Sequence, residues 1–134
     1  MAKIFLIRHG QDCDNKNGIL NGHRDTSLTD LGRQQSLLVA SRLKKENIEI
    51  IYSSPLKRTY ETALIIGNIL EVGKIIIEKD LIERNFGILT GKPICEISKY
   101  AKKIVKNDGI DYFIEAKGIE TFLTTHQRAE LIFK

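Results

Sequence analysis

The sequence predicts an α/β fold with three layers, α/β/α, built around a mainly parallel sheet. Short apolar runs at residues 3–7, 48–52 and 74–78 alternate with longer segments of helical periodicity, the order typical of parallel strands joined by helices. Stretches containing glycine separate these segments, as expected for loops. Each apolar run is also followed by polar side chains, and ligands of parallel sheets bind beyond the carboxyl ends of the strands.

The first third of the chain predicts a strand, a long loop and a helix. Residues 3–7 have the composition of a buried strand, and residues 9–26 hold several glycines and many polar side chains, which favours a loop. Thr29 or Ser27 can cap a helix that runs to about residue 46. The apolar side of this helix consists of Leu31, Leu37, Leu38, Ala40 and Leu43.

The middle of the chain predicts a second strand, a second helix and a third strand. The strands are residues 48–52 and 74–78, and Pro55 stands where the helix between them can begin. Gly73 is expected to end this helix. The apolar stripe of the helix consists of Leu56, Tyr60, Ala63, Gly67 and Leu70.

The last third predicts a loop over residues 80–92 and two helices, near 93–106 and 119–132. Four lysines recur with helical spacing on the first of these helices. They are expected to form one solvated face and not a site for nucleic acid. These lysines are Lys99, Lys102, Lys103 and Lys106.

Length and composition indicate a single domain, residues 1–134. The chain has 42% hydrophobic and 28% charged residues and a net charge of +4, which gives no reason to expect a nucleic-acid partner. No apolar run is long enough to span a membrane, and the stretch before Arg8 is too short for a signal peptide, so a cytoplasmic location is expected. Cys13 and Cys95 form no CxxC pair, so neither a zinc site nor a redox motif is predicted.

Polar residues that follow the three strands are expected to meet at one edge of the sheet. Arg8 and His9 come directly after the first strand. Ser54 follows the second strand, and Arg58 lies one helical turn later. Glu83 lies in the loop after the third strand. Because parallel strands end at the same edge, these side chains should lie close together.

The residue types at this edge suit phosphoryl transfer. Guanidinium groups from Arg8 and Arg58 offer bidentate donors to phosphate oxygens. His9, next to these cations, would stay neutral and could act as a nucleophile. Glu83 is the available acid for the leaving oxygen. The same residues also fit structural or solvent-facing roles, so residue types and spacing alone leave both interpretations open.

Five sequence blocks carry a family resemblance over nearly the whole chain. The blocks are LIRHGQ with Asn15, NGHRDTSLTDLGRQQS, IYSSPLKRTYETA, LIERNFGILTGK and GIETFLTTHQR, in which Glu120 precedes Arg128. In this order they resemble the histidine phosphatase superfamily, the phosphoglycerate-mutase-like proteins. Their spacing is most similar to the branch of fructose-2,6-bisphosphatase-like phosphatases.

The resemblance implies a role for each matching catalytic position. His9 would be the phosphorylated nucleophile, with Arg8 and Arg58 clamping the phosphoryl group. Glu83 would protonate the leaving group and later activate water. Asn15 would be a polar residue of the phosphate pocket.

The resemblance further implies that Asn21 and Gly22 belong to the loop that closes over the substrate. His23, in the same loop, matches no family position, and either a contact with substrate or a plain loop role fits it. A small phosphorylated metabolite is the implied partner. No metal or other cofactor is implied, because guanidinium groups stabilise the developing charge.

The match to the family breaks at the C-terminus. The family has a second catalytic histidine in a later strand–His–Gly block, and the sequence stops at Lys134 without that block. His126 lies inside a predicted helix and is not expected to replace this histidine. The resemblance therefore implies a C-terminally shortened member with impaired activity. Its first strand, residues 3–7, would lack a neighbour. Three explanations are open: another segment takes that place, a second copy does so in a homodimer, or the chain is a fragment of a longer protein.

Three functions are compatible with the sequence. The first is a phosphatase that hydrolyses small phosphomonoesters through a phosphohistidine on His9. The second is a remnant without catalysis that binds phosphorylated ligands or a protein partner, which the missing histidine favours. The third is a phosphoglycerate mutase, which is less favoured because the stretch between the third strand and the GIET block is short.

Overall fold

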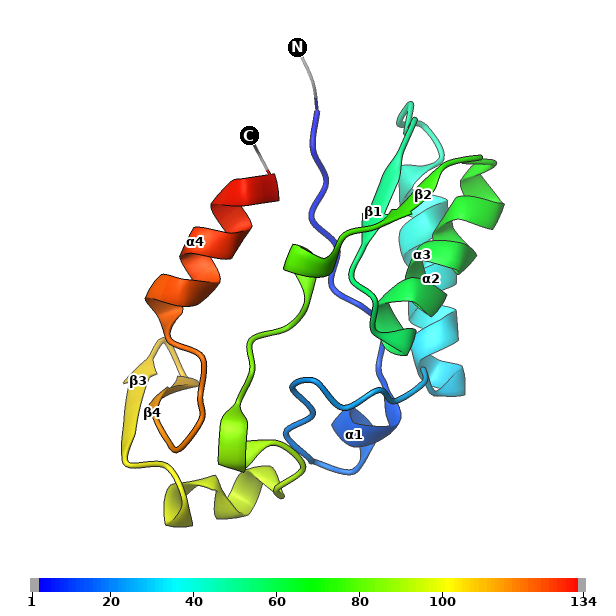
Figure 1. Cartoon of the computed structure of the whole chain (residues 1–134). Helices are drawn as coiled ribbons and strands as arrows, with labels where there is room; N and C mark the ends of the chain where they lie inside the picture. Colours follow the sequence, from blue (N-terminus) through cyan, green and yellow to red (C-terminus); the bar gives the residue numbers. More distant parts are fainter. Residues whose placement is uncertain (1–2, 133–134) are drawn as a thin grey trace.

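The computed structural model describes residues 3–132 and has an α/β architecture with a parallel pair of strands (Figure 1). Strands β1 (Ile51–Ser53) and β2 (Ile75–Ile77) pair in parallel, with Ile51 opposite Ile75. Helix α3 (Lys57–Leu70) connects the strands and packs on both of them, and α2 (Asp30–Leu43) packs along α3. The predicted order of strand, helix and parallel strand is therefore confirmed.

Helix α2 begins at a cap that the sequence predicts. The hydroxyl of Thr29 accepts a hydrogen bond from the main-chain N–H of Gly32 over 3.1 Å, so Thr29 and not Ser27 is the N-cap. The buried members of the helix are small, and they include Ser36 and Ala40. Small side chains let α2 approach α3 closely.

Helix α3 ends before the predicted stop at Gly73. Glu71 adopts a left-handed conformation with a φ of 56° and is the C-cap. The N–H of Val72 then donates to the carbonyl oxygen of Gly67 over 2.9 Å, which satisfies one of the last carbonyl groups of the helix. Ala63 and Ile66 are buried on this helix.

Residues 3–7 form no strand, so the prediction of a buried strand is wrong. The segment makes no backbone hydrogen bond with any other part of residues 3–132. Leu6 and Ile4 expose 88% and 66% of their surface. An apolar run becomes a buried strand only where a neighbouring strand pairs with its backbone, and β1 pairs with β2 instead.

The predicted helix near residues 93–106 is also wrong. Ile94–Lys99 form a 3-10 helix, η3, and the chain then enters an antiparallel hairpin of β3 (Lys103–Asn107) and β4 (Ile110–Glu115). The turn residues Asp108 and Gly109 both have positive φ, 49° and 77°, as an Asp-Gly hairpin turn requires. The lysines expected on one helical face lie instead on η3, on β3 and between them.

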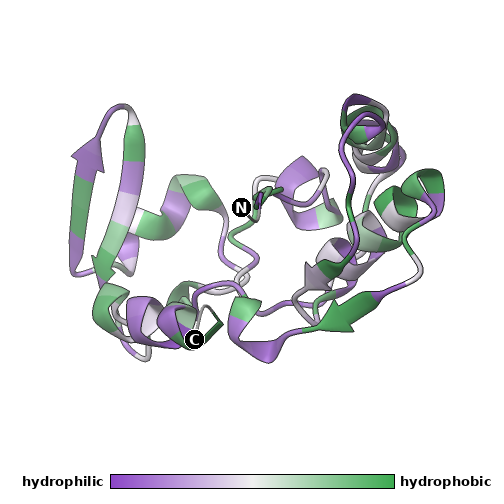
Figure 2. Cartoon of the chain, turned by 90° about the horizontal axis from the view of Figure 1, so that it is seen from above, coloured by the Kyte–Doolittle hydropathy of each residue, from purple (hydrophilic) through white to green (hydrophobic). Residues whose placement is uncertain are grey.

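The C-terminal part of the chain has an apolar cluster of its own. Its buried members are Leu89, Ile97 and Ala116. Helix α4 (Phe122–Ile132), predicted near 119–132, packs against the 3-10 helix η1 (Lys79–Leu81). In Figures 1 and 2 the β3–β4 hairpin stands apart from the α2–α3 pair.

Short helices occupy the remaining loops. These are α1 (Cys13–Lys16), after the first polar segment, and η2 (Gly87–Leu89), after η1. In the part of the chain that the structure describes, every helix is too short or too polar to cross a bilayer.

Candidate active site

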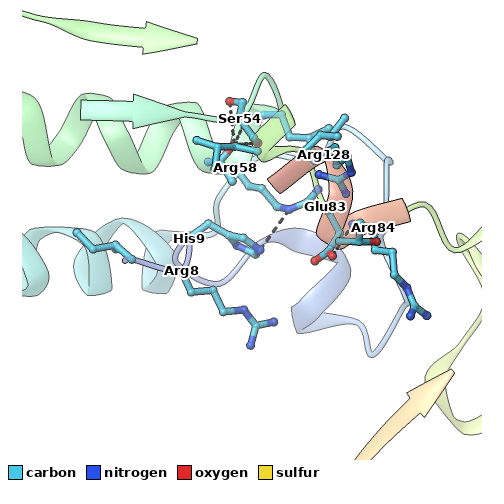
Figure 3. A pocket seen from close by; sticks show the side chains of 13 residues that line it. Arg8, His9, Ser54, Arg58, Glu83, Arg84 and Arg128 are labelled. Carbon is cyan, nitrogen blue, oxygen red and sulfur yellow. Dashed lines mark hydrogen bonds between the residues drawn. The ribbon is translucent and has the colours of Figure 1, made fainter. Parts of the chain in front are cut away.

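Side chains from separate parts of the chain meet around one cavity of about 250 Å³ (Figure 3). Arg8 and His9 come from the end of the N-terminal segment. Ser54 and Arg58 come from the turn between β1 and α3 and from α3 itself, and Glu83 comes from the loop after η1. The structure thus brings together the four residues to which the sequence assigns catalysis.

The imidazole of His9 has a defined tautomer. Its Nδ1 lies 2.7 Å from the carbonyl oxygen of Gly10, which can only accept a hydrogen bond, so Nδ1 carries the proton. Its Nε2 accepts a hydrogen bond from Nε of Arg58 over 3.2 Å. Burial lowers the pKa of His9 below its ordinary 6.5, and Arg58 and Arg8 add to this effect. The Gly10 carbonyl and the carboxylate of Asp12 oppose it. The neutral imidazole expected from the neighbouring cations therefore has burial as its main cause.

Close backbone packing holds the His9 segment against α2. A Cβ atom on Gly10 would lie 2.2 Å from the carbonyl oxygen of Gly32, and one on Gly32 would lie 2.1 Å from that of Gln11. Only glycines allow so close an approach of two backbones. The N–H of Gly10 also donates to the hydroxyl of Thr62 on α3 over 3.2 Å. Both helices therefore fix the peptide that follows His9.

Arg58 is almost completely buried, with 1% of its surface exposed, and each of its guanidinium nitrogens has a partner. Nη1 and Nη2 donate to the carbonyl oxygens of Arg24 and Gly22, both over 2.8 Å. Nε contacts His9 and lies 3.4 Å from Oδ2 of Asp12. Burial lowers the pKa of Arg58, and Asp12 is the main group that opposes this shift. Arg58 therefore joins the loop around Gly22 to the imidazole.

Arg8 differs from Arg58 in its surroundings. It lines the cavity and is exposed, and it makes no hydrogen bond or ion pair with other residues of the described range, 3–132. Its side chain extends beside His9 in Figure 3. The N–H donors of Arg8 are therefore open to an anion, whereas Arg58 offers only those N–H bonds that its internal partners leave free.

The loop residues predicted to bind phosphate surround a buried carboxylate, Asp12. Asp12 is the N-cap of α1 and accepts hydrogen bonds from the main-chain N–H of Asn15, over 2.7 Å, and from the side-chain amide of Asn21. The Asn15 side chain bonds back to the N–H of Asp12, which completes a capping box. Neither asparagine lines the cavity, and Gly22 contributes its carbonyl oxygen to Arg58.

Asp12 was not among the predicted site residues, although 0% of its surface is exposed. The spacing of Asp12 and Asn15, at N-cap and N3, is a signal for a helix start that could have located α1. Its contact with Arg58 depends on the fold, because 46 residues separate the two positions along the chain.

Glu83 lies across the cavity from His9 and is exposed (Figure 3). Its Oε1 accepts a hydrogen bond from the main-chain N–H of Arg84 over 2.7 Å. Its carbonyl oxygen lies 2.6 Å from Nε2 of His23, which donates to it. His23 therefore connects the loop around Gly22 to the segment that carries Glu83.

Arg84 connects the Glu83 segment to the C-terminal part of the chain. Only 6% of its surface is exposed, and its side chain is directed away from His9 in Figure 3. The guanidinium carbon lies 4.1 Å from the ring centre of Phe122 and 5.1 Å from that of Phe86. It also donates to the carbonyl oxygen of Phe113 on β4.

Glu120 and Arg128, which stand in the last sequence block, form a two-point ion pair. Nε and Nη2 of Arg128 lie 2.7 and 3.1 Å from the Glu120 carboxylate oxygens. This arginine also donates to the carbonyl oxygen of Asp80, and Glu120 accepts from the N–H of Asn85. The pair lowers the pKa of Glu120. It attaches α4 to both ends of the segment that carries Glu83.

The cavity combines an unprotonated imidazole nitrogen, a guanidinium group without a partner in the described chain, and a carboxyl group. These groups supply a nucleophile, positive charge for anionic oxygens, and a proton donor. Among residues 3–132, no three His, Cys, Asp or Glu side chains are grouped so that they could hold a metal ion. The arrangement therefore suits transfer of an anionic group to His9.

The sequence was compared with models of known protein families. The model of the histidine phosphatase superfamily (branch 1) matches residues 4–134, nearly the entire chain. The chain belongs to this superfamily. The family inferred from the five sequence blocks is thereby confirmed.

The curated relatives of this chain include proteins named as phosphatases and proteins named as mutase-like. Phosphoserine phosphatase 1 of Hydrogenobacter thermophilus is 33% identical over 131 residues, which cover 97% of this chain and 62% of that protein. Phosphoglycerate mutase-like protein 4 of Arabidopsis thaliana is 41% identical over 106 residues, covering 78% of this chain and 46% of that protein. The chain spans about half the length of the curated relatives it matches.

Solved structures of superfamily members share the fold. YhfR of Bacillus stearothermophilus superposes with a TM-score of 0.77 at 25% identity, over 94% of this chain and 62% of that chain. A mycobacterial glucosyl-3-phosphoglycerate phosphatase in complex with VO3 gives a TM-score of 0.74 at 26% identity, over 93% and 62%. The predicted phosphoglycerate-mutase-like α/β class is confirmed by these similarities.

Proposed function

We propose that the chain is a phosphatase that hydrolyses small phosphomonoesters through a phosphohistidine on His9. The observation that carries this proposal is the state of the imidazole. Nδ1 holds its proton against the Gly10 carbonyl, so Nε2 keeps a lone pair beside a cavity lined by Arg8 and Glu83. Relatives named phosphoserine phosphatase and glucosyl-3-phosphoglycerate phosphatase support the same class of reaction.

In the first step, the lone pair of His9 Nε2 attacks phosphorus, and the bond between phosphorus and the ester oxygen breaks. Glu83, as its carboxylic acid, gives its proton to that oxygen, and the alcohol leaves. Arg8 and the free N–H bonds of Arg58 bind the phosphoryl oxygens and stabilise their charge. The N–H at Nδ1 stays on the Gly10 carbonyl and keeps the ring in position.

In the second step, water attacks phosphorus from the side that the alcohol has left. The Glu83 carboxylate takes a proton from this water, and the bond between phosphorus and Nε2 of His9 breaks. The electron pair returns to the imidazole, and inorganic phosphate leaves. Formation and hydrolysis of the phosphohistidine use the same residues, so one cavity is sufficient for both steps.

The test is phosphate release by the purified chain beside two histidine variants. Substrates are p-nitrophenyl phosphate, phosphoserine, and a panel of sugar and glycerate phosphates. We expect His9→Ala to abolish release and His126→Ala, an exposed histidine on α4, to leave it unchanged. Equal release by the His9→Ala variant would contradict the proposal.

Two other functions give different results in the same assay. The relative named phosphoglycerate mutase-like protein 4 supports a mutase as the second candidate, and this function predicts isomerisation of 3-phosphoglycerate with added 2,3-bisphosphoglycerate without net phosphate release. A binding remnant predicts that phosphate or vanadate binds and no substrate turns over. In the proposal, Arg8 and Arg58 bind the phosphoryl oxygens directly. The predicted binding residues Asn15, Asn21 and Gly22 do not line the cavity and hold Asp12 and Arg58 in place.

Four further properties belong to the same proposal. The chain acts as one domain over residues 1–134, needs no metal, works in the cytoplasm, and self-associates through the apolar segment 3–7. Because no metal is needed in this proposal, we expect full activity in the presence of EDTA. Light scattering should detect a homodimer, and a clean monomer that unfolds cooperatively would count against self-association. Membership of the fructose-2,6-bisphosphatase-like branch stays a prediction.

A further inference from the structure

Two acceptor atoms lie near Nε of Arg58, and its N–H is hydrogen-bonded to the first of them. The first is Nε2 of His9, at 3.2 Å, and the other is Oδ2 of Asp12, at 3.4 Å. Side chains of Arg58 and Asp12 expose 1% and 0% of their surface, so both have little contact with bulk solvent. When a buried N–H group loses its acceptor, the state of the protein without that hydrogen bond is destabilised.

Phosphorylation of His9, as set out in the proposed function, removes the first of these acceptors. The lone pair of Nε2 becomes the bond to phosphorus, while the proton on Nδ1 remains with the Gly10 carbonyl. Nε2 can then no longer accept the hydrogen bond from Arg58. A movement of about half an ångström would bring Nε of Arg58 to an ordinary hydrogen-bond distance from Asp12.

We propose that Asp12 is a positioning residue that takes over the Nε–H of Arg58 when Nε2 of His9 becomes bonded to phosphorus. This inference rests on the proposed function of His9. Arg58 lines the cavity and Asp12 does not, so the transfer leaves the second N–H bond of Nη1 and of Nη2 for the phosphoryl oxygens. Asp12 thereby acts on the reaction through Arg58 and does not touch the substrate.

The carboxylate of Asp12 is suited to this role because it meets donors on both oxygens. Oδ1 accepts from the N–H of Asn15, and Oδ2 accepts from the amide of Asn21 and faces Arg58. An asparagine at position 12 has one acceptor oxygen and one NH2 group. In either orientation, that NH2 group would face another donor.

The first experiment uses the unaltered chain. Phosphoramidate phosphorylates histidine chemically, and an excess of it renews the phosphohistidine that the second step consumes. NMR can then follow the carboxyl carbon of Asp12 and the Nε–H of Arg58. We expect the Asp12 carboxyl resonance to shift on phosphorylation while the Arg58 Nε–H signal stays protected from exchange with water. An unchanged Asp12 resonance would overturn the proposal, because the phosphoryl oxygens would then be the acceptor.

The second experiment measures the rate at which phosphohistidine forms in Asp12→Asn and in Asp14→Asn. Asp14 is a matched control, since it is a buried carboxylate of the same helix that pairs with the side chain of Arg24. We expect Asp12→Asn to slow phosphorylation by roughly 5- to 150-fold with little change in KM, and Asp14→Asn to stay within about twofold of the unaltered chain. Equal rates in the two variants would overturn the proposal.

The failure of this inference differs from the failure of the proposed function. If phosphoramidate and substrates both leave His9 unmodified, the nucleophile assignment fails and the role of Asp12 fails with it. If His9 is phosphorylated and Asp12 does not respond, only the role of Asp12 fails. The NMR experiment needs no variant, so misfolding of Asp12→Asn cannot decide the outcome.

Discussion

Nε2 of His23 donates a hydrogen bond to the main-chain carbonyl oxygen of Glu83, 2.6 Å away. On the other side of the same loop, the carbonyl oxygens of Gly22 and Arg24 accept from Arg58. The loop therefore contacts both halves of the cavity, the half with the imidazole and the half with the carboxyl group. Its geometry sets how far apart the proposed nucleophile and the proposed acid lie.

Replacing His23 tests this connection. We expect His23→Ala to lower kcat by roughly 2- to 10-fold, the range for loss of one neutral hydrogen bond, because the segment of Glu83 is held less firmly. KM should change less, since Arg8 and Arg58 still bind phosphate. His23→Gln keeps an N–H donor of similar reach and should restore most of kcat. Equal loss in both variants would show that the hydrogen bond is not the cause.

The lowered pKa of His9 predicts a pH dependence for activity. Four charged groups face this imidazole: Arg8 from its own segment, Arg58 from α3, Asp12 from the cap of α1, and Glu83 across the cavity. Because burial lowers the pKa below 6.5, His9 should stay unprotonated between pH 7 and 6.5, and its contribution to kcat/KM should be lost only as the pH drops through the lowered value. A midpoint above 6.5, from the rate profile or from NMR of the ring, would contradict this.

The same pKa shift predicts how stability depends on pH. Between the lowered pKa and 6.5, unfolded His9 binds more protons than folded His9. The free energy of unfolding should therefore be greatest above pH 6.5, as far as this group is concerned, and fall as the pH decreases through that window. Urea unfolding of the unaltered chain should show this dependence of the free energy of unfolding on pH. The His9→Asn variant should lack it.

The contact between Gly10 and Gly32 predicts that a single methyl group disturbs the site. Gly32→Ala places a Cβ atom 2.1 Å from the carbonyl oxygen of Gln11, so the backbones must move apart. We expect a loss of about 1–3 kcal/mol in the free energy of unfolding, together with lower kcat. Gly73→Ala is the control, because a Cβ there meets nothing within 4 Å. Equal effects of the two variants would exclude the backbone contact as the cause.

The ion pair of Glu120 with Arg128 predicts that α4 supports the Glu83 segment. Glu120→Gln should cost about 1–3 kcal/mol in the free energy of unfolding and lower kcat, because 16% and 13% exposure leaves the pair little water. Since Arg128 lowers the pKa of Glu120, this stabilisation is present above the ordinary pKa of 4.5 and is lost as the pH falls through the lowered value.

Another glutamate on α4 provides the control for this prediction. Among residues 3–132, the one ion-pair partner of Glu130 is the exposed His126, and the Glu130 side chain is 54% exposed. Glu130→Gln should therefore change the free energy of unfolding by less than about 0.5 kcal/mol and leave kcat unchanged. Thermal or urea unfolding of both variants checks the comparison.

Sequence patterns located the elements whose stability is local. Thr29 caps α2 because its own hydroxyl meets the N–H of Gly32, and the stripe from Leu56 to Leu70 predicts α3 from periodicity alone. The segment 3–7 could not be assigned in this way, since its composition fits a strand but a strand depends on a partner. The hairpin at Asp108 and Gly109 carried a readable turn signal that helical spacing of lysines obscured.

The sequence also located the residues that line the cavity, because Arg8, His9, Arg58 and Glu83 follow strand-like runs or the helix start after one. It assigned no role to Asp12, which lies outside the lining, or to Arg84 and Arg128, which also line the cavity. Asp12, Arg84 and Arg128 act on distant parts of the chain through contacts that only the tertiary fold creates. Asn15 matched the family's phosphate-pocket position, yet in the structure it is hydrogen-bonded to Asp12.

The separate apolar cluster of Leu89, Ile97 and Ala116 has a consequence for how the molecule opens. The pair α2–α3 packs on β1 and β2, whereas Leu20 of the loop around Gly22 packs on this cluster, so we expect two cooperative units within the one domain. Arg58 on α3 connects them through the carbonyl oxygens of Gly22 and Arg24. Hydrogen exchange should show two protection levels. Breakage of these contacts would separate the proposed nucleophile from the proposed acid while both units stay folded. Heat should therefore inactivate the chain at a lower temperature than the one at which it unfolds.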